Sequence, residues 1–138
     1  MTTTTTTTTT PRTPKQARNE ILDAETRLAD AHAGLKAAEE VLDDKAAYAD
    51  PDVPRAAASL RHCAAILAAR AAQARRLAQE TLHVVCAAAC PCSDREPWFC
   101  DAVTVRALAP RLLKAADYAD VRVREAHEYA AMFATSST

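Results

Sequence analysis

The stretch ILDAETRLADAHAGLKAAEEVL, residues 21–42, decides how this chain folds. A large aliphatic residue recurs in it every seven positions, and an alanine follows three positions after each of the first three. The large residues are Ile21, Leu28, Leu35 and Leu42, and the alanines are Ala24, Ala31 and Ala38. This heptad spacing is typical of a helix that presents a narrow stripe to a close neighbour. It predicts a first helix over about residues 15–49.

A second apolar stripe follows the segment DPDVP at 50–54. Two prolines beside acidic residues that can act as caps predict that one helix ends there and another begins. The second helix is expected over about 54–89. Its stripe alternates steps of four and three and consists of Leu60, Ala64, Leu67, Ala71, Ala74, Ala78, Thr81, Val85 and Ala88.

A third stripe follows the segment CPCSDREP at 90–97, which has the spacing of a helix-capping box and two further prolines. The third helix is expected over about 97–133. Its stripe consists of Ala102, Val105, Ala109, Leu112, Ala116, Ala119, Val123, Ala126, Ala130 and Phe133. Pro110 lies inside this run and predicts a kink, because proline removes one backbone hydrogen bond.

Three helices of similar length joined by short breaks predict an all-α fold, an antiparallel three-helix bundle with Ala-rich, coiled-coil-like packing. Residues 14–134 would form this single bundle. The nine threonines at 2–10 have no apolar face and precede two prolines, so residues 1–13 are expected to be a disordered tail.

The composition favours self-association. Of the 138 residues, 34 are alanines, whereas Trp, Tyr and Phe together number six. Because alanine buries little apolar area, a slim three-helix unit leaves its stripes partly uncovered. A homo-oligomer, with a dimer as the default, or a helical protein partner is therefore expected.

Net charge and hydropathy argue against two other classes of protein, nucleic-acid binders and membrane-spanning proteins. A formal net charge of −1 argues against a nucleic-acid partner, which usually requires a basic surplus. No apolar run approaches the ~20 residues of a membrane span, and no leader opens the chain, so a soluble, cytoplasmic protein is expected. An excess of Ala and of Arg over Lys indicates GC-rich coding, as in a high-GC bacterium or its phage, in which case the chain could be a virion component.

The cysteines supply the strongest candidate site. At 100° per residue, His83, Cys86 and Cys90 fall within about 60° of one another on one helix face. A hairpin turning after them would bring Cys92 or Cys100 to the same end of the bundle. Histidine and thiolates are ligands that zinc prefers, so His83, Cys86, Cys90, Cys92 and Cys100 form a candidate metal site with zinc as the cofactor.

Two other interpretations of the cysteines stay open. Cys90 and Cys92, on either side of Pro91, or a pair between two helices could act as a redox switch or form an intermolecular disulfide. A disulfide framework is not the first expectation, because the number of cysteines is odd and no secretion signal is visible. They could also fill alanine-like positions as small hydrophobic residues. A second grouping of His62, Cys63 and His127 is conceivable, far along the helix from the first.

Other chemistry is poorly represented. A single glycine cannot build a phosphate-binding loop or a dinucleotide-binding motif, and the sequence contains no recognisable set of catalytic-triad residues. Arg70, Arg75 and Arg76 form a small basic patch whose simplest explanation is pairing with acids on a neighbouring helix.

The leading hypothesis is a non-enzymatic helical interaction or assembly protein that acts through self-association or partner binding. The alternative is a metal-binding or thiol redox-switch protein centred on the cysteine cluster.

Overall fold

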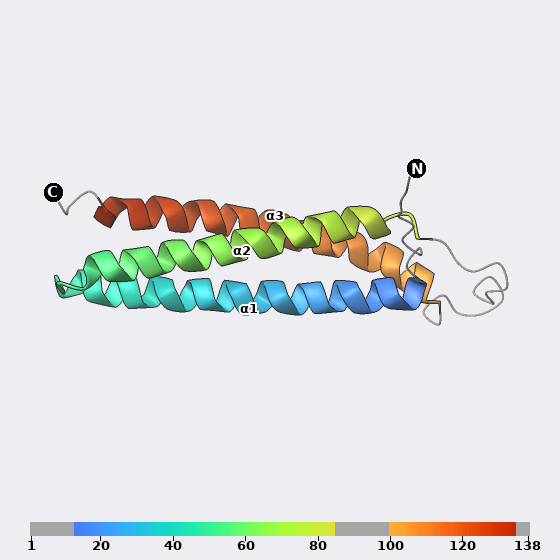
Figure 1. Cartoon of the computed structure of the whole chain (residues 1–138), viewed down its shortest axis with the longest axis horizontal. Coiled ribbons are helices and arrows are strands. Elements are labelled where there is room, and N and C mark those ends of the chain that lie inside the picture. Colours follow the sequence, from blue (N-terminus) through green and yellow to red (C-terminus); the bar gives the residue numbers. More distant parts are fainter. Residues whose placement is uncertain (1–12, 85–99, 135–138) are drawn as a thin grey trace, which may run out of the picture.

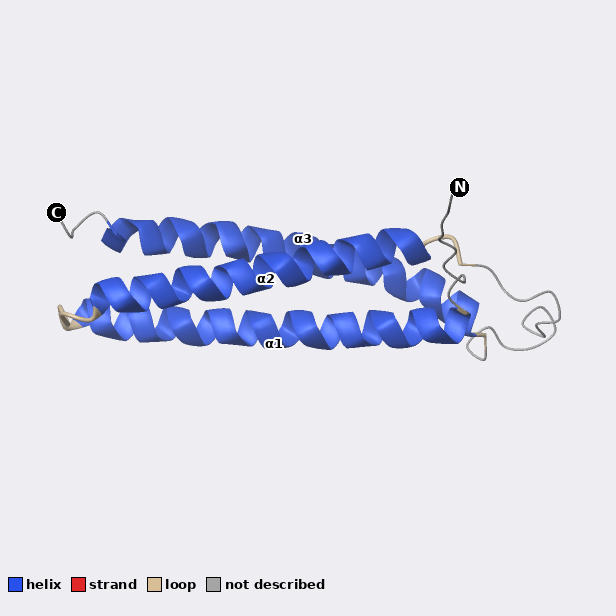
Figure 2. Ribbon diagram, viewed as in Figure 1, coloured by secondary structure: helices blue, strands red, loops and turns tan. Residues whose placement is uncertain are grey.

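The computed structural model describes residues 13–84 and 100–134, and in these ranges every regular element is a helix (Figures 1 and 2). The helices are α1 (Pro14–Ala47), α2 (Val53–Thr81) and α3 (Asp101–Ala134). Figure 1 shows α2 running back along α1 from a tight turn, with α3 returning beside both. The expected antiparallel three-helix bundle is confirmed. None of the described helices is long and apolar enough to cross a bilayer.

Local capping explains where α1 begins. The Thr13 hydroxyl accepts a hydrogen bond from the Gln16 backbone N–H at 3.1 Å, and the Gln16 side chain accepts one from the Thr13 N–H at 3.0 Å. Pro14 occupies the first turn, where its missing N–H costs nothing. The helix therefore begins at Pro14, next to the position that the sequence predicts.

The break between α1 and α2 falls where two prolines stand in the sequence. Ala49 takes a left-handed backbone conformation with φ of 50°, which stops α1 at Ala47. The Asp52 N–H then donates to the Asp50 side chain at 2.8 Å. These contacts complete a tight turn, and α2 starts at Val53.

The other helix ends differ from the sequence prediction. α2 was expected to reach about residue 89, but it ends at Thr81, where the Val84 N–H donates to the Thr81 carbonyl at 3.2 Å and tightens the chain into a turn. α3 begins at Asp101 rather than near residue 97, and Cys100 accepts its first backbone bond from Thr104 at 3.1 Å. Residues 85–99 lie outside the described ranges, as does the tail at 1–12.

The three predicted stripes form the core. Their fully buried large members are Ile21, Leu35 and Leu42 of α1, Leu60 and Leu67 of α2, and Val105 and Leu112 of α3. Alanines of all three helices fill the positions between them in one continuous cluster. Ala24, Ala31, Val123 and Phe133 lie at its edge and are partly buried. Val85 and Ala88 of the predicted second stripe lie outside the described residues.

Pro110 does not end α3, which is one helix from Asp101 to Ala134. The proline itself is exposed, so its ring does not disturb the core. Figure 1 shows the orange beginning of α3 inclined toward the start of α1 and its red remainder lying along the upper edge of the bundle. A missing backbone bond at Pro110 allows such a change of direction within a helix.

The alanine core predicts that a larger side chain is not tolerated. Ala71 is fully buried, and its neighbour Ala72 is exposed on the same helix. Ala71→Leu is expected to lower the free energy of unfolding by about 1–3 kcal/mol, because a closely packed interior has no room for the added carbons. Ala72→Leu makes the same chemical change in the solvent and should shift it by less than about 0.5 kcal/mol. Urea unfolding followed by circular dichroism measures both, and equal effects would contradict close packing at residue 71.

Candidate functional site

The cysteine cluster falls largely outside the described ranges. Cys86, Cys90 and Cys92 belong to the segment 85–99, so their arrangement stays a prediction. His83 is exposed in the turn after α2, and Cys100 is buried with 4% exposure just before α3. Among residues 13–84 and 100–134, no three or more His, Cys, Asp or Glu side chains come close enough to hold a metal ion.

The second predicted grouping of histidine and cysteine does not assemble. His62 and His127 are exposed on α2 and α3, and Cys63 is half-buried between α1 and α2. These three residues are not among any metal-binding group in the described part of the chain. Because His62 and Cys63 are adjacent in a helix, their side chains point about 100° apart, which separates them.

Polar side chains close the seam between α1 and α3. Arg18 bonds Asp101 at 2.9 Å. Seven residues further along α1, both carboxylate oxygens of Glu25 accept hydrogen bonds of 2.7 Å from the Arg111 guanidinium. This two-pronged geometry fixes the register of the two helices. It also raises the pKa of Arg111 through the hydrogen bond and the charge of Glu25.

The same seam continues at the next two heptads of α1. His32 stacks edge to face on Tyr118, with ring centroids 5.5 Å apart. Glu39 accepts a 2.5 Å hydrogen bond from Arg122, and the Tyr129 hydroxyl donates to Asp43. The Asp43 hydrogen bond, with smaller contributions from burial and nearby negative charge, raises the pKa of Tyr129 to about 12. Together these contacts form a polar ladder along α1 and α3.

The predicted basic patch is divided between two seams. Arg75 bonds Asp117 at 2.7 Å and Asp120 at 2.6 Å, both on α3. These hydrogen bonds and charges raise the pKa of Arg75. The explanation by pairing with a neighbouring helix therefore holds for Arg75. Arg70 instead lines a cavity between α2 and α1, and Arg76 is exposed.

The seam between α1 and α2 differs from the other two. Over the described residues 24–42, no hydrogen bond or ion pair joins α1 to α2. Two cavities of about 320 and 270 Å³ lie between these helices, and another of about 270 Å³ lies mainly between α1 and α3. Arg27 and Arg70 line both of the cavities between α1 and α2, so these two form one continuous groove. We call this surface the α1–α2 groove.

The groove walls have their own helical spacing. Cys63, Ile66, Arg70, Gln73 and Leu77 of α2 alternate steps of three and four, and so do Glu20, Asp23, Arg27, Asp30 and Gly34 of α1. Each helix thus carries a second heptad stripe beside its core stripe. Sequence reasoning missed these stripes because charged residues interrupt the apolar ones, although the spacing was present as a signal.

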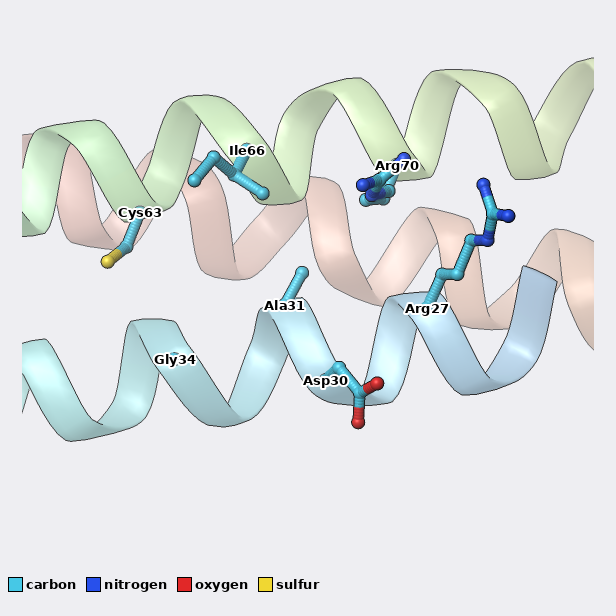
Figure 3. A pocket seen from close by; sticks show the side chains of 7 residues that line it. All are labelled: Arg27, Asp30, Ala31, Gly34, Cys63, Ile66 and Arg70. Carbon is cyan, nitrogen blue, oxygen red and sulfur yellow. The ribbon is translucent and has the colours of Figure 1, made fainter. Parts of the chain in front are cut away.

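Figure 3 shows how the middle of the groove is built. The Arg27 side chain rises from α1 toward α2, Arg70 is seen end-on beside α2, and Asp30 points away from α2, while Cys63 and Gly34 lie toward the other end. A β-carbon added at Gly34 would meet no atom within 4 Å, so this glycine does not serve a close helix crossing within one chain. The residue instead leaves the α1 wall of the groove bare.

The charged residues at the middle of the groove differ in their pairing among the described residues. Arg27 bonds Asp23 of the preceding turn at 2.9 Å. Arg70, which is half-buried, donates only to the neutral Gln73 side chain at 3.3 Å among the described residues. Asp30 is exposed and has no ion-pair partner in the described ranges.

Comparison with known protein families, curated proteins and solved structures finds no match to this chain.

The polar ladder predicts a pH dependence at Tyr129. Asp43→Ala should lower the pKa of Tyr129 from about 12 toward 10, because the hydrogen bond to Asp43 is the largest cause of the increase. A raised folded-state pKa stabilises the fold below pH 10, and this contribution is lost as the pH rises from about 10 to about 12. Ultraviolet absorbance of the phenolate measures the titration, with Tyr129→Phe to assign it. Asp44→Ala, at the exposed neighbouring position, should leave the titration unchanged.

The cysteine cluster predicts a measurable metal content. If His83 and the cysteines at 86, 90, 92 and 100 bind zinc, protein expressed with ample metal should carry about one equivalent, since four such ligands complete a tetrahedral site. Replacing Cys86 and Cys90 together by serine should abolish it. Elemental analysis with thiol titration measures both, and negligible metal with five freely titrating thiols would exclude the metal and disulfide interpretations.

Proposed function

We propose that this chain is a non-enzymatic interaction or assembly protein that adds a further helix to its α1–α2 groove, by self-association or by binding a helical partner. The observation that carries the proposal is the difference between the seams. Among the described residues, polar pairs bridge α1 to α3 and α2 to α3, whereas residues 24–42 of α1 make none to α2. A groove between two antiparallel helices is where a fourth helix packs in helical bundles.

Exposed aliphatic side chains support this proposal. Ile66 lines the groove and is 41% exposed. Val41 is 49% exposed and lies seven residues after Gly34, on the same face of α1. Covering such residues removes apolar area from water, which stabilises an assembly by about 25 cal/mol per Å². The small alanine core gives this added burial more weight than it would have in a larger domain.

The titratable groups support a non-enzymatic role. In the described residues, the resolved pKa shifts belong to Arg75, Arg111, Arg122 and Tyr129. Each shift is caused mainly by a hydrogen bond between helices or within one helix, and each moves the pKa further from neutrality. These pairs hold helices in register, whereas acid–base catalysts usually have a pKa near the working pH. The metal or thiol-switch alternative depends on the cysteines tested above.

Self-association predicts a mass above that of one chain. Multi-angle light scattering at micromolar concentrations should give a mass greater than 14.8 kDa, decreasing toward that value on dilution. Ile66→Asp should shift the equilibrium toward the single chain, because a charge in the groove disfavours burial. Leu22→Asp is the matched control, since Leu22 has a similar 42% exposure but does not line the groove. A helical protein that keeps the mass of one chain at every concentration would contradict self-association.

A further inference from the structure

We infer that the part of α3 that precedes Pro110, residues 101–109, opens as a unit separate from the rest of the bundle, and that this opening controls access to the buried thiol of Cys100. The inference is independent of the α1–α2 groove. Three observations carry it: a proline inside α3, the short length of helix before that proline, and two single polar contacts that hold this length of helix to its neighbours.

Pro110 interrupts the backbone hydrogen bonds of α3. Because proline has no N–H, the carbonyl of Arg106, four residues earlier, loses the helical bond that it would otherwise accept. Figure 1 shows that the orange beginning of α3 is inclined toward the start of α1, whereas the remainder follows another direction. Residues 101–109 are therefore joined to the rest of α3 less cooperatively than in an unbroken helix.

The helix before Pro110 is too short to be stable alone. Isolated helices shorter than about 12–15 residues are marginal in water, because the first turn is costly to form. Residues 101–109 therefore stay helical only while they pack into the core, where Val105 is fully buried and Leu108 is 9% exposed. Separation from the core and loss of the helix should thus occur together, as local unfolding of one unit.

Two polar contacts hold this unit at its end of the bundle. Arg18 of α1 bonds Asp101 at 2.9 Å, and both side chains are about one third exposed (36% and 34%). The Arg106 guanidinium donates to the Val84 carbonyl, just after α2, at 3.1 Å. Partly exposed contacts of this kind contribute little each, so they close the unit without locking it.

The remainder of α3 is anchored more firmly. Arg111, next to Pro110, makes two hydrogen bonds of 2.7 Å to Glu25 of α1. Further along, Asp117 and Asp120 both accept hydrogen bonds from Arg75 of α2. Because the two-pronged contact to α1 follows directly after the proline, an opening that begins at residue 101 should stop there.

The opening extends to Cys100. This residue directly precedes α3, and it is 4% exposed. Its carbonyl accepts the Thr104 N–H at 3.1 Å and the Thr104 hydroxyl at 3.2 Å. Since Cys100 is bonded to the first turn of α3, it is released when that turn unfolds. A reagent in solution therefore reacts with the Cys100 thiol in the open state.

Hydrogen exchange of the full chain, resolved by residue with NMR, tests the separate opening. Amides 105–109 are expected to be roughly tenfold less protected than amides 114–126 of the same helix, because opening before Pro110 exposes only the first group. Pro110→Ala restores the N–H that bonds the Arg106 carbonyl and should remove most of this difference. Equal protection of the two groups in the wild-type chain would overturn the inference.

Removal of the two polar contacts tests how the unit is held. Arg18→Ala and Arg106→Ala should each lower the protection of amides 105–109 by about two- to fivefold and leave amides 114–126 unchanged. Arg18→Ala is the sharper variant, because it lies on α1 and does not alter the helix propensity of α3. Variants that lower the protection of both groups equally would contradict a separate unit.

Matched controls remove a charge elsewhere on the same helices. Lys36 of α1 and Arg124 of α3 are exposed, and both lie away from the end of the bundle that holds residue 101. Lys36→Ala and Arg124→Ala should leave the protection of amides 105–109 unchanged. Circular dichroism checks that every variant is folded.

Alkylation of Cys100 tests control of the thiol. Labelling of the reduced full chain with iodoacetamide is quantified by mass spectrometry of the peptide that carries Cys100. The labelling rate should increase about two- to fivefold in Arg18→Ala and Arg106→Ala, in step with the loss of protection, and should decrease in Pro110→Ala. A labelling rate that stays constant while amides 105–109 lose protection would overturn the control of Cys100.

Discussion

Each heptad of α1 buries one large aliphatic residue among alanines contributed by all three helices. This burial determines how the helices pack. Ile21, Leu35 and Leu42 are fully buried, and the positions around them in the core cluster belong largely to alanine. Small side chains at a helix contact bring the axes close together and leave little freedom to substitute larger ones. The arrangement of polar groups at the seams depends on this spacing, because Arg and Glu side chains must span from one helix to the next.

The three helix–helix seams differ in the polar contacts that join their helices. Between α1 and α3, polar contacts recur at heptad intervals from Arg18 to Glu39, and between α2 and α3 Arg75 contacts two aspartates. Partly exposed ion pairs contribute little stability each, about 0–1 kcal/mol, so their main effect is to fix register and partner choice. The α1–α2 groove lacks such pairs over residues 24–42 of α1, and among the described residues Arg70 donates only to the Gln73 side chain. The proposed self-association follows from this difference.

Much of the fold was predictable from the sequence because helical periodicity is local. The stripe at Leu60, Leu67 and Ala74 needed only the spacing along one helix, and the structure buries it. The end of α2 at Thr81 was not predictable, since the apolar pattern continues to Ala88 while the backbone turns at residues 82 and 83. The candidate site was predicted least well. Sequence patterns directed attention to the cysteines, whereas the groove is lined by a mixed polar and apolar stripe that periodicity analysis does not distinguish from a solvated face.

The sequence by itself determined three helices, the described part of their core stripes and the break near residue 50, because each depends on neighbouring residues along the chain. Only the tertiary structure decided which seam lacks polar pairs over residues 24–42 of α1. That choice depends on the side of the α1–α2 hairpin against which α3 packs, and heptad spacing within each helix does not specify it. Packing α3 on one side brought Asp117 and Asp120 to Arg75 and left Arg70 in the groove on the other side. Two arginines five residues apart therefore have different roles, because helix geometry points them toward different neighbours.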